Sequence, residues 1–176
     1  LGFGGSSLHA QSNANPYGIR NDLFDIYQRA ERVADQPQVL KIADSLFAIG
    51  NKIHDVQVQA MAYNLKGRYA LMTKDLATLR HIQKNLESLV RGTPHEWFLF
   101  HNWDRIFVYY LSQGQMANAL NELERYQTTA AKYNNSYGIS LGWLNTGHIL
   151  CMQNMSAAAV DYYQKVLKAQ LSGADD

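Results

Sequence analysis

The sequence has little of several features that would point directly to a function. It has one cysteine, Cys151, among 176 residues, which excludes an internal disulfide and a metal site built from several cysteines. It has no run of 18 apolar residues, so nothing within these residues is expected to span a membrane. Lys and Arg number 16 against 15 Asp and Glu, without a basic stripe, which argues against nucleic acid as a partner.

Motifs for catalysis, cofactors and metals are also missing. His95 and Glu96 begin like the zinc motif H-E-x-x-H, but Leu99 stands where the second histidine is needed. His148 and Cys151 are three residues apart on a predicted helix, where a thiol–imidazole pair could form, although a buried cysteine usually acts as a small apolar residue. No other acid, base and nucleophile converge, so we predict a non-enzymatic chain without a cofactor or metal.

What the sequence does have is helical periodicity. Hydrophobic residues make up 47% of the chain, and no strand-like alternation persists over four residues or more. The fold class is therefore all-α. The first helix is expected to begin at Asn21 or Asp22, and Gly50 is expected to end the second. The later helices are expected over 56–72, 76–91, 96–112 and 116–131, followed by two helices within 143–166.

The stretch from Trp143 to Val166 carries the most informative pattern. Trp143, Gly147, Ala159 and Tyr163 combine large and small side chains at helical spacing, with a turn at 153–154. Small residues let two helices approach closely, and large residues fill the space beside them. The pattern resembles the tetratricopeptide repeat, although Thr146 and Leu150 stand where that repeat has Leu and Tyr.

Steps of 40 residues extend the pattern towards the N-terminus. Gly147 corresponds in this way to Phe107, Gly67 and Tyr27, and Ala159 corresponds to Ala119, Leu79 and Val39. The resemblance therefore implies a right-handed superhelix of about four antiparallel helix hairpins over residues 19–171. Helices with unrelated spacing in a simple bundle are the alternative.

In tetratricopeptide arrays the first helix of each hairpin lines a concave groove, and this geometry implies a binding surface here. The predicted groove residues are Gln28, Glu31, Asn64, Arg68, His101, Asp104, Leu144, His148 and Cys151, with Phe24, Leu71, Val108 and Leu111 beside them. Their mixture of charged, amide and apolar groups suits a peptide or protein segment as ligand.

Arg68 and His101 are the best candidates within that groove for anchoring an acidic group, since arginine offers a planar fork of donors. Arg68 could equally pair with Asp104 as a structural bridge. The aromatic cluster 97–100 is expected in the core, with a dimerisation patch as the alternative, so a homodimer stays open.

Residues 1–18 are interpreted as a signal-peptide remnant or flexible leader, because Leu8-His9-Ala10 before Gln11 is similar to a cleavage site. Residues 172–176 are interpreted as a tail. Residues 20–170 resemble the tetratricopeptide-like extracytoplasmic regions of sensor histidine kinases from Bacteroidetes-type bacteria, chiefly through the opening LFDIYQRAERVADQPQVLKIADSLFAIGNK and the segment AMAYNLKGRYALMTKD.

This resemblance implies a periplasmic sensor module whose kinase and membrane segments lie outside the chain. The alternative is a cytoplasmic adaptor, or the regulatory domain of a transcriptional regulator.

Overall fold

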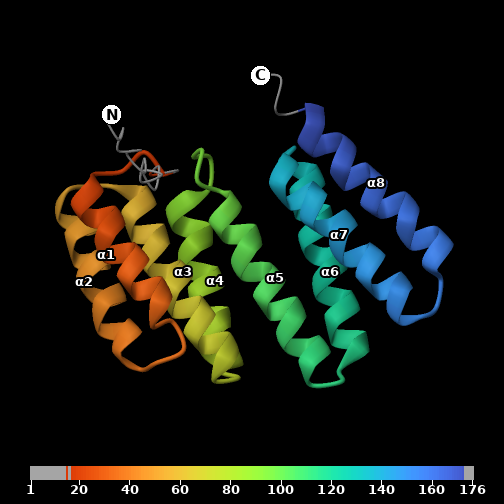
Figure 1. The fold of residues 1–176 in the computed structure, drawn as a ribbon, viewed down its shortest axis with the longest axis horizontal. Coiled ribbons are helices and arrows are strands. Elements are labelled where there is room, and N and C mark those ends of the chain that lie inside the picture. The colour runs from red at the N-terminus through yellow and green to blue at the C-terminus, as the bar shows by residue number, and fades with distance from the viewer. Residues whose placement is uncertain (1–14, 16, 173–176) are drawn as a thin grey trace, which may run out of the picture.

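The computed structural model describes residue 15 and residues 17–172, and within them the chain forms eight α-helices joined by short turns (Figure 1). No strand is present in this part of the chain, so the all-α prediction is confirmed. The helices are α1 (Asn21–Arg32), α2 (Gln38–Lys52), α3 (Val56–Met72), α4 (Leu76–Val90), α5 (Trp97–Ser112), α6 (Met116–Lys132), α7 (Ser136–Met152) and α8 (Ser156–Ser172).

One kind of turn recurs after five of the helices. In each, a residue adopts a left-handed backbone conformation, and the N–H of the next residue donates to a carbonyl five positions back at 2.8–2.9 Å. The left-handed residues are His54, Lys74, Gly114, Asn134 and Asn154, spaced by 20 residues with one step of 40. The periodicity of the chain therefore lies in its turns as well as in its apolar positions.

Polar side chains start several of the helices that follow. Asp55, Asp75 and Asn135 each accept a hydrogen bond from the backbone N–H three residues further on, at 2.8–3.0 Å. The Asn135 cap starts α7 at Ser136, which corrects the prediction that placed this helix within 143–166.

The prediction that Gly50 ends α2 is also wrong, because the helix continues to Lys52. Gly50 lies inside the helix and faces α3, where an added Cβ would lie 2.9 Å from the backbone nitrogen of Gln59. Its small size serves a close helix–helix approach, not a helix stop.

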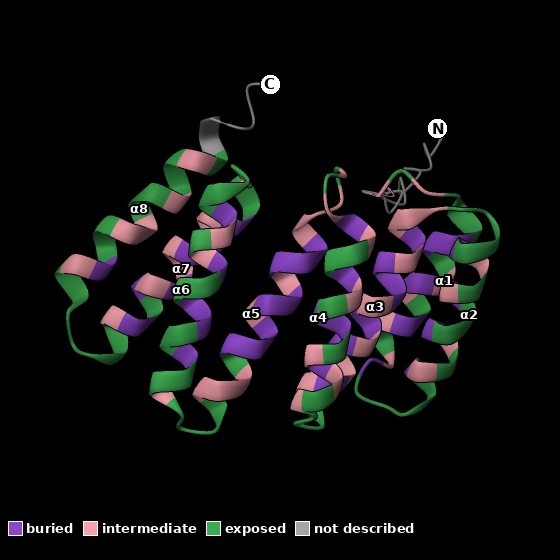
Figure 2. Cartoon of the chain, turned by 180° about the vertical axis from the view of Figure 1, so that it is seen from behind, coloured by how far each residue is buried: buried purple, intermediate pink, exposed green. Residues whose placement is uncertain are grey.

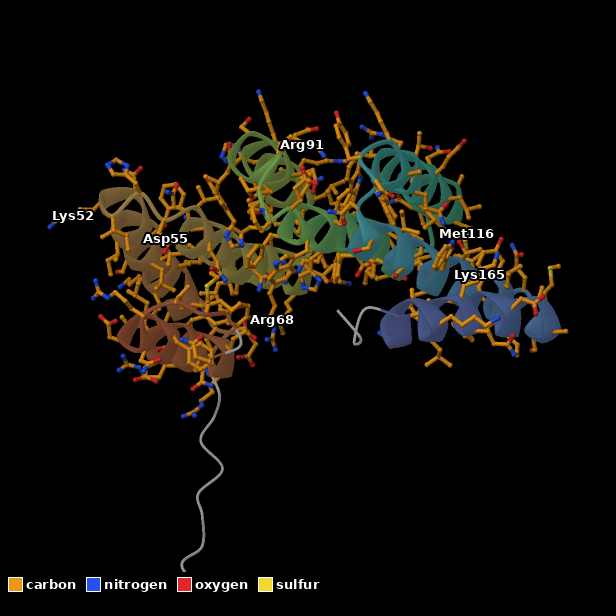
Figure 3. All side chains as sticks on the ribbon, turned by 90° about the horizontal axis from the view of Figure 1, so that it is seen from above. Lys52, Asp55, Arg68, Arg91, Met116 and Lys165 are labelled. Carbon is orange, nitrogen blue, oxygen red and sulfur yellow. The ribbon has the colours of Figure 1, made fainter. Side chains whose placement is uncertain are left out.

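The helices pack in two ways. Each helix contacts the next along the chain, and α1 contacts α3, α3 contacts α5, and α5 contacts α7. The odd-numbered helices therefore form a continuous row, called the odd row below. Figure 3 shows the molecule from above, with Arg68 of α3 projecting on the side of the chain that faces the space between α1 and α8.

The two series of residues 40 positions apart are buried throughout. Tyr27, Gly67, Phe107 and Gly147 of the odd row form one such series. Val39, Leu79, Ala119 and Ala159 of the even-numbered helices form the other. At the last hairpin an added Cβ on Gly147 would lie 2.5 Å from the ring of Tyr163, so α7 and α8 approach closely at the predicted position.

The core has two parts, and α5 belongs to both. Phe98 and Leu99 join the apolar cluster of α1–α4, whereas Phe100 and Trp103 join a second cluster, formed mainly by α5–α7 with Ala70 of α3 and Leu79 of α4. Figure 2 shows the buried residues of α5 spread along much of its length. The helix α5 therefore connects the two halves of the molecule.

Candidate functional site

A pocket of about 680 Å³ opens between α1, α3 and the first half of α5. Phe24, Tyr27, Asn64 and Arg105 are buried and form its floor, whereas Arg68 is exposed at its rim. The volume lies in the range of pockets that hold small molecules or a peptide side chain. The complete lining is Tyr17, Phe24, Tyr27, Gln28, Glu31, Arg32, Asn64, Arg68, Trp97, His101 and Arg105.

The structure brings together five of the nine predicted groove residues in this pocket, namely Gln28, Glu31, Asn64, Arg68 and His101. Asp104 lies outside its lining and accepts a hydrogen bond from Asn145 Nδ2 at 2.6 Å. Burial raises the pKa of Asp104, and this hydrogen bond opposes that change.

The three predicted residues of α7 are not part of this pocket. Leu144 lines a separate groove between α7 and α8. The ring of His148 lies 5.8 Å from that of Tyr163, and Cys151 Sγ lies 3.5 Å from the hydroxyl of the same tyrosine. The predicted groove is therefore divided into two regions along the odd row.

A hydrogen-bonded chain crosses the pocket floor from α1 to α5. Asn64 Nδ2 donates to Tyr27 Oη, and Arg105 Nη2 donates to Asn64 Oδ1, both at 2.7 Å. Burial raises the pKa of Tyr27 far above its usual value, so the phenol stays neutral. Asn64 thereby links the neutral phenol of Tyr27 on α1 to the guanidinium of Arg105 on α5.

Arg105 is the unusual member of this chain. It is only 7% exposed, and burial lowers its pKa to about 10. Within the described residues it belongs to no ion pair, and its Nη1 has no hydrogen-bond partner. Because nearly all buried polar groups in folded proteins are paired, this guanidinium is a candidate for contact with an anion.

The structure contradicts one of the two roles that the sequence left open for Arg68, the bridge to Asp104. Its Nη1 pairs with Glu31 Oε2 at 2.5 Å, not with Asp104. Both side chains remain partly exposed, and such pairs add little to stability. The pair can therefore open at small cost when a ligand competes for either partner.

His101 lies on α5 one turn before Arg105. Its Nδ1 lies 3.1 Å from the hydroxyl of Tyr137, and its ring lies 6.3 Å from that of Trp97. Burial and the nearby charge of Arg105 lower its pKa to about 4. The imidazole is therefore neutral at pH 7, so it can exchange hydrogen bonds with a ligand but supplies no positive charge to the acidic group that it is predicted to anchor.

The lowered pKa of His101 predicts a loss of stability in mild acid. The unfolded chain binds a proton near pH 6.5 and the folded chain only near pH 4, so the stability present above pH 6.5 falls as the pH drops through this window. We expect a loss of about 1 to 2 kcal/mol, since the ring keeps some solvent contact. Urea unfolding of wild type and His101→Gln at pH 7 and pH 4.5 measures it, and equal losses in the two proteins would contradict the prediction.

Sequence reasoning missed Arg105, Trp97, Tyr17, Tyr27 and Arg32 as lining residues. Arg105 follows His101 by one turn and could have been found from that spacing, but its 40-residue counterpart is the core residue Leu65. Tyr17 falls in the segment interpreted as a leader, yet its ring packs on Phe24, Tyr27 and Trp97. Of that segment, residues 1–14 and 16 lie outside the described residues.

The described part of the chain contains neither a helix that could span a membrane nor a cluster of metal ligands. None of its helices is both long and apolar enough to cross a bilayer. No group of three or more His, Cys, Asp or Glu in residues 15 and 17–172 is arranged to hold a metal ion. Comparison with protein-family models, with curated proteins and with solved structures gives no significant match to the chain.

Proposed function

We propose that this chain is a non-catalytic binding module that holds a peptide or protein segment on the odd row, with an acidic group of that segment at Arg105. The observation that carries the proposal is a buried guanidinium in the floor of an open pocket, with no ion pair to any described residue. Three arginines but only one carboxylate, Glu31, line this pocket, so its electrostatic potential favours an anion. Aromatic side chains beside them suit an apolar neighbour of that group.

The packing supports a tetratricopeptide-like arrangement as part of the proposal. Contacts between successive odd helices, buried positions 40 residues apart and a recurring turn are what a stack of about four helix hairpins requires. A right-handed superhelix of this kind would present the odd row on its concave side, where an extended segment could lie across several helices.

The wider role that we propose is an extracytoplasmic sensor region of a histidine-kinase type protein, and its support is the sequence resemblance. A ligand bridging α1 and α3 to α5 would favour one stacking of the hairpins, provided that it binds two stackings with different affinity. A cytoplasmic adaptor is the alternative. Reading the native gene past residue 176 tests the sensor role. We expect it to encode a membrane helix and a kinase there, and a stop codon at that point would contradict the sensor role.

The binding proposal predicts a specific requirement for Arg105. Random peptides displayed on phage should yield clones enriched in Asp or Glu when selected on the wild-type protein. Arg105→Gln should lower the affinity for a selected synthetic peptide by about tenfold or more, because a charge-assisted hydrogen bond is lost. Calorimetry would measure this affinity.

Arg29→Ala is the matched control, since Arg29 is exposed on α1 and lines none of this pocket. It should leave the affinity unchanged. Equal binding of the peptide by wild type and Arg105→Gln, or no clone enriched above an uncoated surface, would show the proposal to be wrong.

A further inference from the structure

Glu31 is the only carboxylate among the described residues that line the pocket at Arg105. It lies on α1, and its Oε2 is 2.5 Å from Nη1 of Arg68 on α3. Arg68 is one of the three arginines that give the pocket its positive potential, so one of these charges is already paired within the chain. The pocket therefore holds both the cations that would attract an acidic ligand and a carboxylate of its own.

The repeat does not require a carboxylate at this position. The counterparts of Glu31 at steps of 40 residues are Leu71, Leu111 and Cys151. Those of Arg68 on the next two odd helices are Val108 and His148. The contacts of α3 with α5 and of α5 with α7 therefore form without an ion pair between their described residues.

Other contacts hold α1 against α3. Tyr27 Oη accepts from Asn64 Nδ2 at 2.7 Å, and Leu23 and Tyr27 belong to the core cluster that α1 shares with α3. The side chains of Glu31 and Arg68, by contrast, are 32% and 46% exposed, and an ion pair this accessible to water adds little to stability. The ion pair is therefore not what holds these two helices together.

Both members of the pair act electrostatically on Arg105 in the pocket floor. Burial lowers the pKa of Arg105, the carboxylate of Glu31 opposes this change, and the guanidinium of Arg68 adds to it. An acidic group that approached Arg105 would be repelled by Glu31 and attracted by Arg68, and it would be attracted most once Arg68 is released from its partner.

A ligand could use this ion pair in two ways. An acidic group could replace Glu31 on Arg68, or a basic group could replace Arg68 on Glu31. The lining favours the first exchange, because three arginines surround one carboxylate and a basic group would meet the charge of Arg105.

We propose that Glu31 is an internal competitor, which occupies Arg68 in the free protein and is displaced when an acidic segment binds. The proposal rests on the function proposed above for this pocket, because it concerns the same ligand. An anion that contacts Arg68 alone competes with a carboxylate tethered beside it at a high effective concentration. A segment that also binds Arg105 has further contacts to drive the exchange, so Glu31 makes the pocket selective for the larger ligand.

The test measures the affinity of the full chain for a fluorescein-labelled acidic peptide that phage display selects on the wild-type protein and that contains no Lys or Arg. Glu31→Gln should raise this affinity by about fivefold or more, because Arg68 is then available and a like charge is removed. Fluorescence anisotropy measures the change. Circular dichroism shows whether each variant is folded.

A double variant shows whether the gain arises at Arg68. When Arg68→Gln is added to Glu31→Gln, the arginine that Glu31 occupied is gone, so the affinity should return to that of the wild type or below it. A gain that persists in the double variant would overturn the proposal, because Glu31 would then act by repulsion alone.

Asp25→Asn is the matched control. Asp25 is an exposed carboxylate on the same helix, outside the pocket lining, so its replacement changes the net charge by the same amount. The affinity should stay within about twofold of the wild-type value, because solvent screens a charge at this distance from the ligand.

The result for Arg105→Gln separates this proposal from the one on which it rests. If Arg105→Gln weakens binding while Glu31→Gln leaves it unchanged, the binding site stands and the competitor role is wrong. If Glu31→Gln also weakens binding, Glu31 is a partner of the ligand and the competitor role is again wrong. If Arg105→Gln has no effect, both proposals are wrong.

Discussion

Glu122→Ala is expected to lower the free energy of unfolding by about 3 kcal/mol, the largest effect of any single change considered for this molecule. Glu122 lies on α6 and is only 3% exposed. Removal of this buried carboxylate leaves the buried N–H of Trp103 without an acceptor and Arg80 without its ion-pair partner, and loss of such a network is among the few mechanisms that give losses of this size.

The contacts of Glu122 explain the expectation. Its carboxylate pairs with Arg80 of α4 through both oxygens, and Oε2 accepts from Trp103 Nε1 at 2.9 Å. Arg125 adds a third donor at 3.2 Å from its own helix. Burial alone would raise the pKa of Glu122, but the hydrogen bonds from Arg80 and Trp103 outweigh it, and the pKa lies below its usual value.

Thermal or urea unfolding would measure this effect. Glu122→Gln keeps an acceptor for Trp103 but loses the charge opposite Arg80, so a loss of roughly half that of Glu122→Ala is expected. Glu124→Ala changes an exposed carboxylate two residues away and should stay within about 0.5 kcal/mol of wild type. If Glu122→Ala is as stable as Glu124→Ala, the ion pair between Arg80 of α4 and Glu122 of α6 contributes nothing to the free energy of unfolding.

Glu122 also shows where sequence reasoning about the fold was successful and where it stopped. The spacing of 40 residues placed Ala119 and Leu123 on the buried face, and both are buried. Glu122 lies between them on the same face, but its counterpart at position 82 is isoleucine, so the repeat gave no reason to expect a carboxylate in the core. The pairing of the buried Glu122 depends on Arg80, a partly buried partner 42 residues away in the sequence, which periodicity does not reveal.

In the candidate pocket, too, some residues could be predicted from the sequence and others could not. Gln28, Asn64 and Arg68 were found because residues beside the packing positions of odd helices share one face, and that rule needs only helical geometry. Arg105 was missed because the same rule assigns its position to the core, where it does lie. The sequence could not show that a core position opens into a pocket, because this depends on how far α1 stands from α5.

Gly138→Ala is expected to lower the free energy of unfolding by about 1 to 2 kcal/mol. The added methyl group would lie 2.8 Å from Ala130 Cβ and from the ring of Phe100. Ala130 Cβ is fixed to the backbone of α6, and Phe100 is fully buried, so neither can move without shifting a helix. The intrinsic helix preference of alanine over glycine, about 1 kcal/mol, offsets only part of this strain.

Gly147→Ala on the same helix is the matched comparison. Its added methyl group would lie 2.5 Å from the ring edge of Tyr163, a shorter distance than at Gly138. Tyr163 is only half-buried, however, and α8 contacts no described helix except α7, so the ring and its helix can yield. We therefore expect Gly147→Ala to stay within about 0.5 kcal/mol of wild type despite the closer contact.

Urea unfolding of the two variants shows which factor determines the loss of stability. One factor is the distance from the added methyl group to its neighbour, and the other is the ability of that neighbour to move away. If Gly147→Ala lowers the free energy of unfolding more than Gly138→Ala does, the length of the contact determines the loss, and α8 is held as firmly as the inner helices. The expected order, with Gly138→Ala less stable, requires that α7 is fixed on α5 and α6 while α8 adjusts to it. That order would also mean that the groove between α7 and α8 has one rigid wall, α7, and one adaptable wall, α8.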